Sequence, residues 1–333
     1  MVGLCVSGDL DAGSLEPPGP PGPTMKTINQ VEPRTPISSL PIVIAAPGSY
    51  YLTGDLFGSG GQVGINITSS FVTLDLNGFS LIGGAGTLDG IRAQVAGTEH
   101  VVIRNGVIRG WGGAGISALS ATDVHAEDLR IDGNGGSGMV VGARSIVRNT
   151  TSTGNVTSGI YADTGSTVIG CTAGSNGSTG FVLNPGTVAT DCAAQQNVVG
   201  FGLSLGSRVV HSSARANTTG IFGGDGVSIE GCSVDGNTDD GIRVGNRGLI
   251  RGNVARGNTN DGIEASGNEN RIEENESTAN GVGIAVFGIN NIVVKNSAGA
   301  NSNTEYLIFN PNNKVGPISA DPVTAGPWAN FDL

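Results

Sequence analysis

Two neighbouring carboxylates stand out in the stretch NTDDGI, residues 237–242, where Asp239 and Asp240 follow an asparagine and a threonine. A related stretch further along the chain, NTNDGI, contributes Asp261. Glycoside hydrolysis uses two carboxyl groups, one to protonate the leaving oxygen and one to assist attack on the sugar. An aspartate before Gly-Ile also suits a tight turn, because its side chain bonds to nearby backbone. These three residues are therefore candidate catalytic acids, although we favour the architectural interpretation of NTDDGI over the catalytic one.

NTDDGI is one copy of a repeat that returns every 20 to 22 residues. The leading asparagines of the repeat are Asn134, Asn155, Asn176, Asn197, Asn217, Asn237, Asn258, Asn280 and Asn301. Such a fixed interval indicates a solenoid, in which each repeat forms one coil and contacts only the coils next to it.

Apolar residues alternate with others directly after each turn, as at Ile242 and Val244. This period of two is typical of a strand with one buried face. Two further apolar columns lie eight and three residues before each repeat asparagine, as at Val168 and Ala173. No helix-length apolar pattern fits between these strands. The sequence therefore predicts an all-β fold, a single-stranded right-handed parallel β-helix with coils of about 20–22 residues.

A polar column five residues before the repeat asparagines is also expected to face inward. It consists of Cys171, Cys192, Ser212, Cys232, Asn253, Asn275 and Asn296. Its asparagines should stack as a ladder, bonding to one another and to turn backbone. Its cysteines are interpreted as small filler, with reactive or metal-binding thiols as the alternative. Neighbouring cysteines in a stacked column run parallel, which suits a disulfide poorly.

The ends of the chain lose the repeat. Residues 1–36 include PPGPPGP and predict a flexible Pro/Gly-rich segment. Residues 37–305 should form the β-helix with an N-terminal cap, and residues 306–333 a C-terminal cap or tail.

The outward residue between the first two apolar positions forms a stripe along the coils. From Val140 through Tyr161, Val182 and Gly202 to Phe222 this stripe is apolar or glycine. It then continues with charge, at Arg243 and Glu264. An exposed apolar stripe usually marks a contact. Tyr161, Phe222, Arg243 and Glu264 are therefore candidate polysaccharide-binding residues. The alternative is that protein covers the stripe, either a terminal segment of the chain or another subunit in a homo-oligomer formed through Val140, Tyr161, Val182 and Phe222.

Charge and composition narrow the range of partners. The formal net charge is −11, and phosphate binding needs clustered basic residues, so a nucleic-acid partner is not expected. No apolar run approaches the roughly 20 residues of a membrane helix, so no membrane partner is expected either. No cofactor is predicted, although acidic turns could hold Ca²⁺ through their oxygen atoms.

GSYYLTGDL, VTLDLNGF and the repeated N-x-x-x-G-I resemble the bacterial right-handed parallel β-helix repeat proteins of the pectin-lyase-like superfamily, in a functionally uncharacterised branch. That superfamily includes polysaccharide lyases, polygalacturonases, epimerases and phage tailspikes. NTDDGI is similar to the NTD stretch of polygalacturonases, which would map onto Asp239 and Asp240, with Asp261 one coil along. The sequence departs from the polygalacturonase pattern elsewhere: it has no HG, and RIE replaces RIK at 271–273. The three histidines, His100, His125 and His211, fall outside these motifs.

The resemblance implies an extracellular or cell-surface protein that binds or processes polysaccharide, of lyase or glycoside hydrolase type if it is an enzyme. The start of the chain, MVGLCVSGDLDAG, is not itself a secretory signal. The alternative function is a non-catalytic structural or adhesive rod. The sequence leaves open whether the protein is an enzyme.

Overall fold

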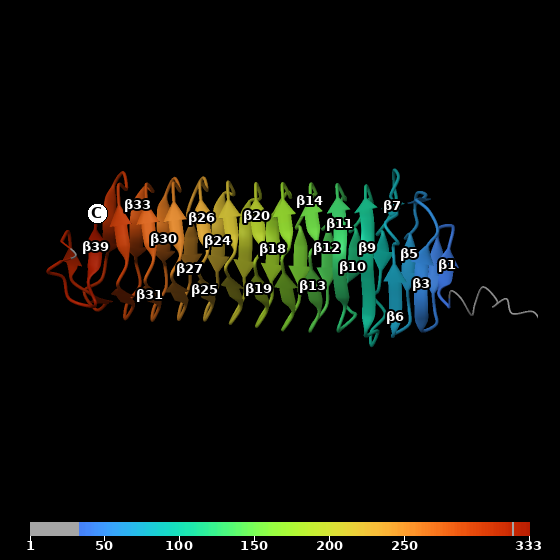
Figure 1. The fold of residues 1–333 in the computed structure, drawn as a ribbon, viewed down its shortest axis with the longest axis horizontal. Coiled ribbons are helices and arrows are strands. Elements are labelled where there is room, and N and C mark those ends of the chain that lie inside the picture. The colour runs from blue at the N-terminus through green and yellow to red at the C-terminus, as the bar shows by residue number, and fades with distance from the viewer. Residues whose placement is uncertain (1–32, 322) are drawn as a thin grey trace, which may run out of the picture. The chain divides into compact units, whose positions relative to one another are not determined.

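The computed structural model describes residues 33–321 and 323–333, and residues 35–333 form one compact unit. Most of the predicted flexible segment, residues 1–32, lies outside the described residues. In the described part of the chain there is no helix, and every strand pairing is parallel. The strands stack coil upon coil from β1 to β39 (Figure 1). The predicted all-β parallel solenoid is therefore confirmed.

One wall of the solenoid is a sheet of 13 strands, which we call sheet 1. It consists of β2 (Ile42–Ile44), β5 (Ile65–Ile67), β8 (Ile91–Arg92), β10 (Ile116–Ala118), β12 (Met139–Val141), β15 (Ile160–Ala162), β18 (Thr179–Leu183), β21 (Val199–Leu203), β24 (Thr219–Gly223), β27 (Ile242–Val244), β30 (Asp261–Ala265), β33 (Val282–Val286) and β36 (Thr304–Ile308).

The other two walls are strand columns that together make a 26-stranded sheet, because the long strands β9 and β11 belong to both. Column 2 contains β3 (Gly48–Leu52), which pairs with β1 (Thr35–Ile37), followed by β6 (Val72–Asp75), β9 (Val101–Arg109), β11 (His125–Asp132), β13 (Ile146–Arg148), β16 (Thr167–Ile169), β19 (Val188–Thr190), β22 (Arg208–Val210), β25 (Ser228–Glu230), β28 (Leu249–Arg251), β31 (Arg271–Glu273), β34 (Ile292–Val294) and β37 (Lys314–Val315). Column 3 contains β4 (Leu56–Phe57), β7 (Ser80–Ile82), the second halves of β9 and β11, β14 (Thr151–Thr153), β17 (Thr172–Gly174), β20 (Ala193–Gln195), β23 (Ser213–Arg215), β26 (Ser233–Asp235), β29 (Val254–Arg256), β32 (Glu276–Thr278), β35 (Ser297–Gly299) and β39 (Asn330–Asp332), which also pairs with β38 (Ile318–Ser319).

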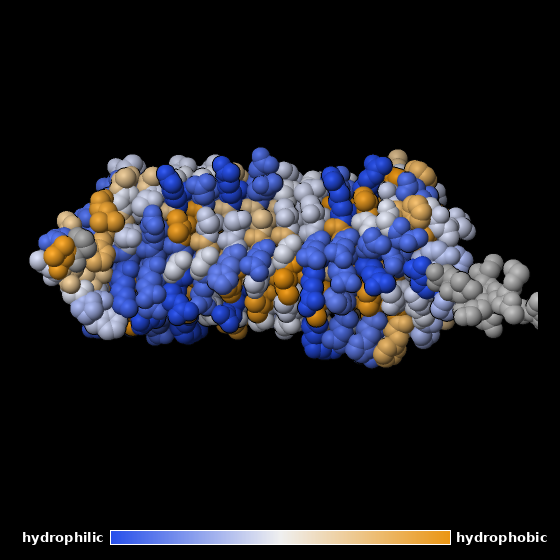
Figure 2. Space-filling view, in the orientation of Figure 1, coloured by the Kyte–Doolittle hydropathy of each residue, from blue (hydrophilic) through white to orange (hydrophobic). Residues whose placement is uncertain are grey.

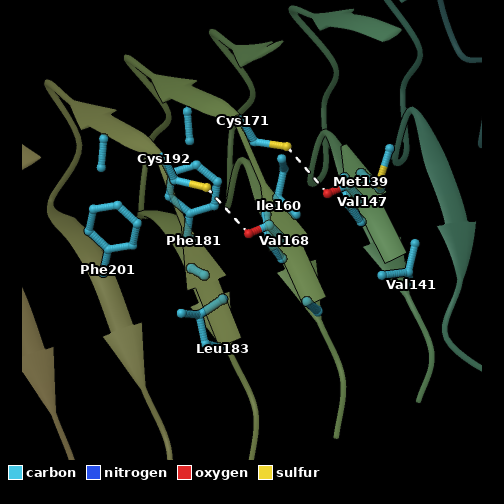
Figure 3. Packing of buried hydrophobic residues seen from close by; sticks show 14 of the residues in the cluster. Met139, Val141, Val147, Ile160, Val168, Cys171, Phe181, Leu183, Cys192 and Phe201 are labelled. Carbon is cyan, nitrogen blue, oxygen red and sulfur yellow. Dashed lines mark hydrogen bonds between the residues drawn. The ribbon is translucent and has the colours of Figure 1, made fainter. Parts of the chain in front are cut away.

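The core runs between the three walls and is built from the predicted columns. Ile221, Val168 and Ala173 are each fully buried. The rings of Phe181 and Phe201 stack on adjacent coils, with centroids 4.8 Å apart (Figure 3). Full burial of one such side chain contributes roughly 1.5–3 kcal/mol, so repetition of these columns stabilises every coil against its neighbours.

Asparagine ladders satisfy the buried polar groups of the turns. In the predicted ladder, Asn253 Nδ2 donates to Asn275 Oδ1 and Asn275 Nδ2 donates to Asn296 Oδ1, at 3.0 and 2.9 Å. A second ladder was not predicted: the repeat asparagines themselves bond from coil to coil, as from Asn237 Nδ2 to Asn258 Oδ1 at 2.8 Å. Both ladders keep the turns of successive coils in register.

Three cysteines lie in the predicted inward column. Cys171, Cys192 and Cys232 are all free and buried. The Sγ atoms of Cys171 and Cys192 point to the carbonyl oxygens of Val147 and Val168 on the preceding coils (Figure 3). Burial raises the pKa of Cys232 to about 11, and a thiol in this state is a poor nucleophile or metal ligand, whereas the hydrogen bond with Cys171 lowers the pKa of Cys192.

The C-terminal strands continue the coils. β36 completes sheet 1, and β39 pairs with β35. The Asn330 side chain accepts from Asn296 Nδ2 and so caps the predicted ladder. Among the described residues, no helix is long and apolar enough to span a membrane.

Candidate functional site

The predicted stripe is one continuous row on sheet 1. Each residue of the stripe pairs with the next on the adjacent strand, in the order Val140, Tyr161, Val182, Gly202, Phe222, Arg243 and Glu264. The Phe222 side chain is 47% exposed, whereas Tyr161 and Val182 are half-buried. On the side of the molecule drawn in Figure 2, hydrophobic residues lie in small groups between hydrophilic ones.

A hydrogen bond fixes the orientation of the Tyr161 ring. Asn184, one coil along, donates through Nδ2 to Tyr161 Oη at 2.5 Å and to Asp163 Oδ1 at 2.8 Å. The ring is thus held at the surface before any ligand arrives, which lowers the entropic cost of binding to it.

Three carboxyl groups converge where the stripe becomes charged. Asp240 lies in the turn before β27, and Asp261 and Glu264 lie on β30 of the next coil. One oxygen atom of each lies within 4.8 Å of the others, and the three side chains are buried, with 1%, 5% and 7% of their surface exposed. We call these three residues the acid cluster. Asp239, the other predicted acid, is half-buried beside the acid cluster and is not one of these three.

Asp240 supports the turn with only one of its oxygen atoms. Its Oδ1 accepts from Asn260 Nδ2 at 2.8 Å and from the Asp261 peptide nitrogen at 3.2 Å. Its Oδ2 is buried and accepts no hydrogen bond from any described residue. A buried oxygen without a hydrogen bond is costly, so the turn alone does not account for this side chain.

Arg243 supplies the positive charge next to these acids. Its Nε lies 3.3 Å from Glu264 Oε1, and its Nη1 lies 3.9 Å from Asp240 Oδ2. The arginine side chain is 44% exposed, in contrast to its buried partners. The Arg243 side chain therefore lies next to the buried acid cluster and is also accessible at the surface of sheet 1.

The pKa values of two acids in the cluster are raised, mainly by burial. Burial raises the pKa of Asp261 to about 6; the Asp240 and Asp239 carboxylates add to the shift and Arg243 opposes it. Burial likewise raises the pKa of Glu264 to about 7, with Asp240 adding and Arg243 opposing. Near neutral pH the acid cluster can therefore both hold and release a proton, as acid–base catalysis requires. Three carboxyl oxygens at this separation also form a donor set that a hard cation such as Ca²⁺ accepts.

The sequence predicted Asp239, Asp240 and Asp261 as candidate catalytic acids, with an architectural role favoured, and Arg243 and Glu264 as candidate polysaccharide-binding residues. What it missed is that Glu264 is buried against Asp240 and Asp261. The available signal was the three-residue offset, which places Asp240 and Asp261 beside Arg243 and Glu264 on stacked coils.

The family model described as the right-handed β-helix region matches residues 63–219 and 219–316. The chain belongs to this family of right-handed parallel β-helix proteins. No curated protein matches the chain by sequence.

Solved structures share the fold at low identity. The A-module of the Azotobacter vinelandii mannuronan C-5 epimerase AlgE6 aligns with a TM-score of 0.56 at 14% identity, over 90% of this chain and 90% of that one. The catalytic domain of a GH87 alpha-1,3-glucanase, solved with tetrasaccharides, aligns with a TM-score of 0.53 at 13% identity, over 93% of this chain and 71% of that one. These likenesses establish the architecture alone.

Proposed function

We propose that the protein is an extracellular or cell-surface polysaccharide-processing enzyme that cleaves glycosidic bonds at the acid cluster. In this proposal Glu264 is the proton donor, Asp240 and Asp261 are the carboxylates that assist attack on the sugar, and Arg243 orients the bound chain. The fold is compatible with this function, since two solved proteins of similar architecture bear the names of polysaccharide-acting enzymes.

The single observation that carries the proposal is the confinement of these acids to two coils. The strand register places Thr219 one coil before Asp240 and Val282 one coil after Asp261, in the same turn position. The equivalent turns of other coils use Ser158 and Thr179. The turn thus forms without a carboxylate. Because burying three carboxyl groups is unfavourable, a structural role does not explain their presence.

The chemistry follows from the protonation of the acid cluster. A carboxylic acid that keeps its proton near neutral pH can transfer it to the glycosidic oxygen as the bond to the anomeric carbon breaks. A carboxylate close by can remove a proton from the attacking water, or attack the sugar itself. The pKa of Glu264, at about 7, suits the first role, and Asp240, with one oxygen unbonded, suits the second.

The stripe offers a path for the sugar chain next to these acids. Phe222 is the neighbour of Arg243 in the row, and Tyr161 lies three coils further along. Three coils span about 14 Å, because stacked strands lie about 4.8 Å apart. Two aromatic faces at this separation can each stack on a sugar ring of one bound chain.

Product analysis tests the proposal. The protein is incubated with a panel of neutral and acidic polysaccharides, and reducing ends and unsaturated products are scored together, because hydrolysis gives only the former. Asp240→Asn and Glu264→Gln should each lower turnover by about 10²-fold or more. The matched control Glu276→Gln, an exposed glutamate on β32, should leave turnover unchanged.

Two results would count against the enzyme. Polysaccharide binding without any product would leave a binding protein, and absence of both binding and turnover would favour the structural rod. Unsaturated products would instead identify a lyase, in which the acid cluster removes a proton from the sugar ring.

A further inference from the structure

A second group of polar side chains lies where three turns enter column 2, well before the acid cluster in the chain. Glu99 and His100 precede β9, Asp123 precedes β11, and Arg144 precedes β13. A bridge between Glu99 and Thr122 and the pairing of His125 with Val102 and Ile146 fix the register. His100, Asp123 and Arg144 therefore occupy the same turn position on three successive coils.

These turn residues share one backbone conformation. His100, Asp123 and Arg144 have φ values of 55°, 54° and 59°, in the left-handed region. Because the backbone has the same conformation at the three positions, their side chains point in the same direction, and side chains from adjacent coils lie next to one another. The His100 ring stacks on Phe71 of the preceding coil with centroids 5.0 Å apart.

Arg144, one coil further along, holds the Asp123 carboxylate in place. Arg144 Nε donates to Asp123 Oδ1 and Arg144 Nη2 donates to Asp123 Oδ2, both at 3.1 Å. Each carboxylate oxygen keeps a further lone pair for a second partner. Side chains that are themselves anchored make better ligands, because little ordering is left to be done on binding.

A surface pocket of about 360 Å³ adjoins the group. His100, Asp123, His125 and Arg144 contribute to its wall, with Val102 and Ile146 as apolar lining. His125 Nε2 is buried there and makes no hydrogen bond with a described residue, and the nearest carboxylate oxygen, Glu127 Oε2, lies 3.6 Å away. The pocket thus contains a nitrogen atom that needs a partner.

We propose that Glu99, His100 and Asp123 form a binding site for a divalent transition-metal ion of the Zn²⁺ class. One carboxylate oxygen of Glu99, one ring nitrogen of His100 and one carboxylate oxygen of Asp123 lie within 4.8 Å of one another. Imidazole with carboxylates is the donor set that zinc accepts, and three protein ligands leave one coordination position for water or a ligand in the pocket. Bonds of about 2.1 Å would bring the three donor atoms to about 3.4 Å apart, a small adjustment for side chains at the surface.

The acid cluster differs from this site in its donors. It contains oxygen atoms alone, which suit Ca²⁺ rather than a transition metal. The two sites also lie on different walls, so that metal binding at His100 is independent of the proposed polysaccharide chemistry.

The chain provides a matched control for the test. Asp191 and His211 form another aspartate–histidine pair at one turn position of adjacent coils, with left-handed φ values of 55° and 47°. Unlike His100, His211 belongs to no group of three potential ligands among the described residues. His211→Ala therefore shows the effect of removing an exposed histidine with a left-handed backbone conformation. His100→Ala shows in addition the effect of removing a metal ligand.

The full-length protein is first treated with a chelator and then titrated with ZnCl₂ by calorimetry and with CoCl₂ by visible absorption. We expect one Zn²⁺ equivalent for the wild type and for His211→Ala. We expect affinity to fall at least about tenfold in His100→Ala and Asp123→Asn. The visible spectrum of the Co²⁺ complex should show the absorption bands of Co²⁺ with a low coordination number, and these bands should disappear in His100→Ala. Absence of binding by the wild type, unchanged binding by His100→Ala, or equal loss in His211→Ala would each overturn the proposal. Circular dichroism of each variant confirms that the solenoid is intact.

Discussion

Replacement of Glu264 by glutamine should stabilise the protein, and the gain should grow as the pH rises. The pKa of Glu264 is raised from its ordinary 4.5 to about 7 in the folded state. When folding raises the pKa of a carboxyl group, that group contributes its full amount to the free energy of unfolding at pH values below its unfolded pKa. This contribution is lost as the pH rises through the folded pKa. Between about pH 4.5 and 7 the wild type therefore loses stability at this site, and glutamine, which does not ionise, avoids the loss.

The size of the effect follows from the shift. A difference of about 2.5 pKa units corresponds to about 3 kcal/mol at pH 8, where the folded state must ionise Glu264, but to less than about 1 kcal/mol at pH 5. At about 2 °C per kcal/mol in a large domain, the melting temperature of Glu264→Gln should exceed that of the wild type by about 6 °C at pH 8 and by about 2 °C or less at pH 5. The glutamine side-chain oxygen can take the place of Glu264 Oε1, which lies 3.3 Å from Arg243 Nε.

Thermal melts of both proteins at pH 5 and pH 8 measure this difference, with Glu276→Gln as the control. The control removes an exposed carboxylate and should show no pH-dependent gain. Equal melting temperatures of Glu264→Gln and the wild type at pH 8, or a loss of stability at both pH values, would show that Glu264 is not held against its neighbours as the structure indicates.

Four further outcomes are expected. Asp239→Asn should change turnover little in an assay of products, because Asp239 lies beside the acid cluster rather than within it. Ile221→Asp should abolish soluble expression, since it places an unpaired charge in a fully buried column. Tyr161→Ala and Phe222→Ala should each weaken polysaccharide binding in a titration while leaving melting nearly unchanged, because their rings contact ligand more than core; a change in oligomeric mass would instead indicate an interface. A chelator should leave polysaccharide turnover unchanged, because the proposed chemistry uses only the acid cluster and the neighbouring Arg243.

The repeat made the fold predictable in detail. In a solenoid one interval fixes the strand length, the register and the inward columns at once, since each coil repeats the geometry of the last. Residues such as Val168, Ala173 and Ile221 were therefore assigned to the core correctly, and the row from Val140 to Glu264 was aligned correctly.

Polar interactions between coils were less accessible to sequence reasoning. The repeat asparagines were interpreted as turn markers, and their ladder remained unpredicted, because a turn asparagine and a ladder asparagine have the same pattern. Burial of Glu264 was also missed: an outward strand position is normally exposed, and alternation alone cannot reveal what surrounds it. The convergence of Glu99, His100 and Asp123 depends on the lengths of the turns before β9 and β11, which the repeat does not fix.

The ladders and the acid cluster belong to one mechanical arrangement. Asn237 and Asn258 stand three residues before Asp240 and Asp261, and Asn258 Nδ2 bonds onward to Asn280 at 2.9 Å. These bonds tie each turn to the next, so that the turns carrying the acids cannot separate to relieve repulsion between the carboxyl groups. The repulsion between these carboxyl groups can be reduced only if they keep protons, pair with Arg243 or bind a partner. A rigid solenoid thereby keeps carboxyl groups buried at a distance that a flexible loop would not maintain, and this burial, with the Asp240 carboxylate adding to it, raises the pKa of Glu264 into the range where a proton can be transferred.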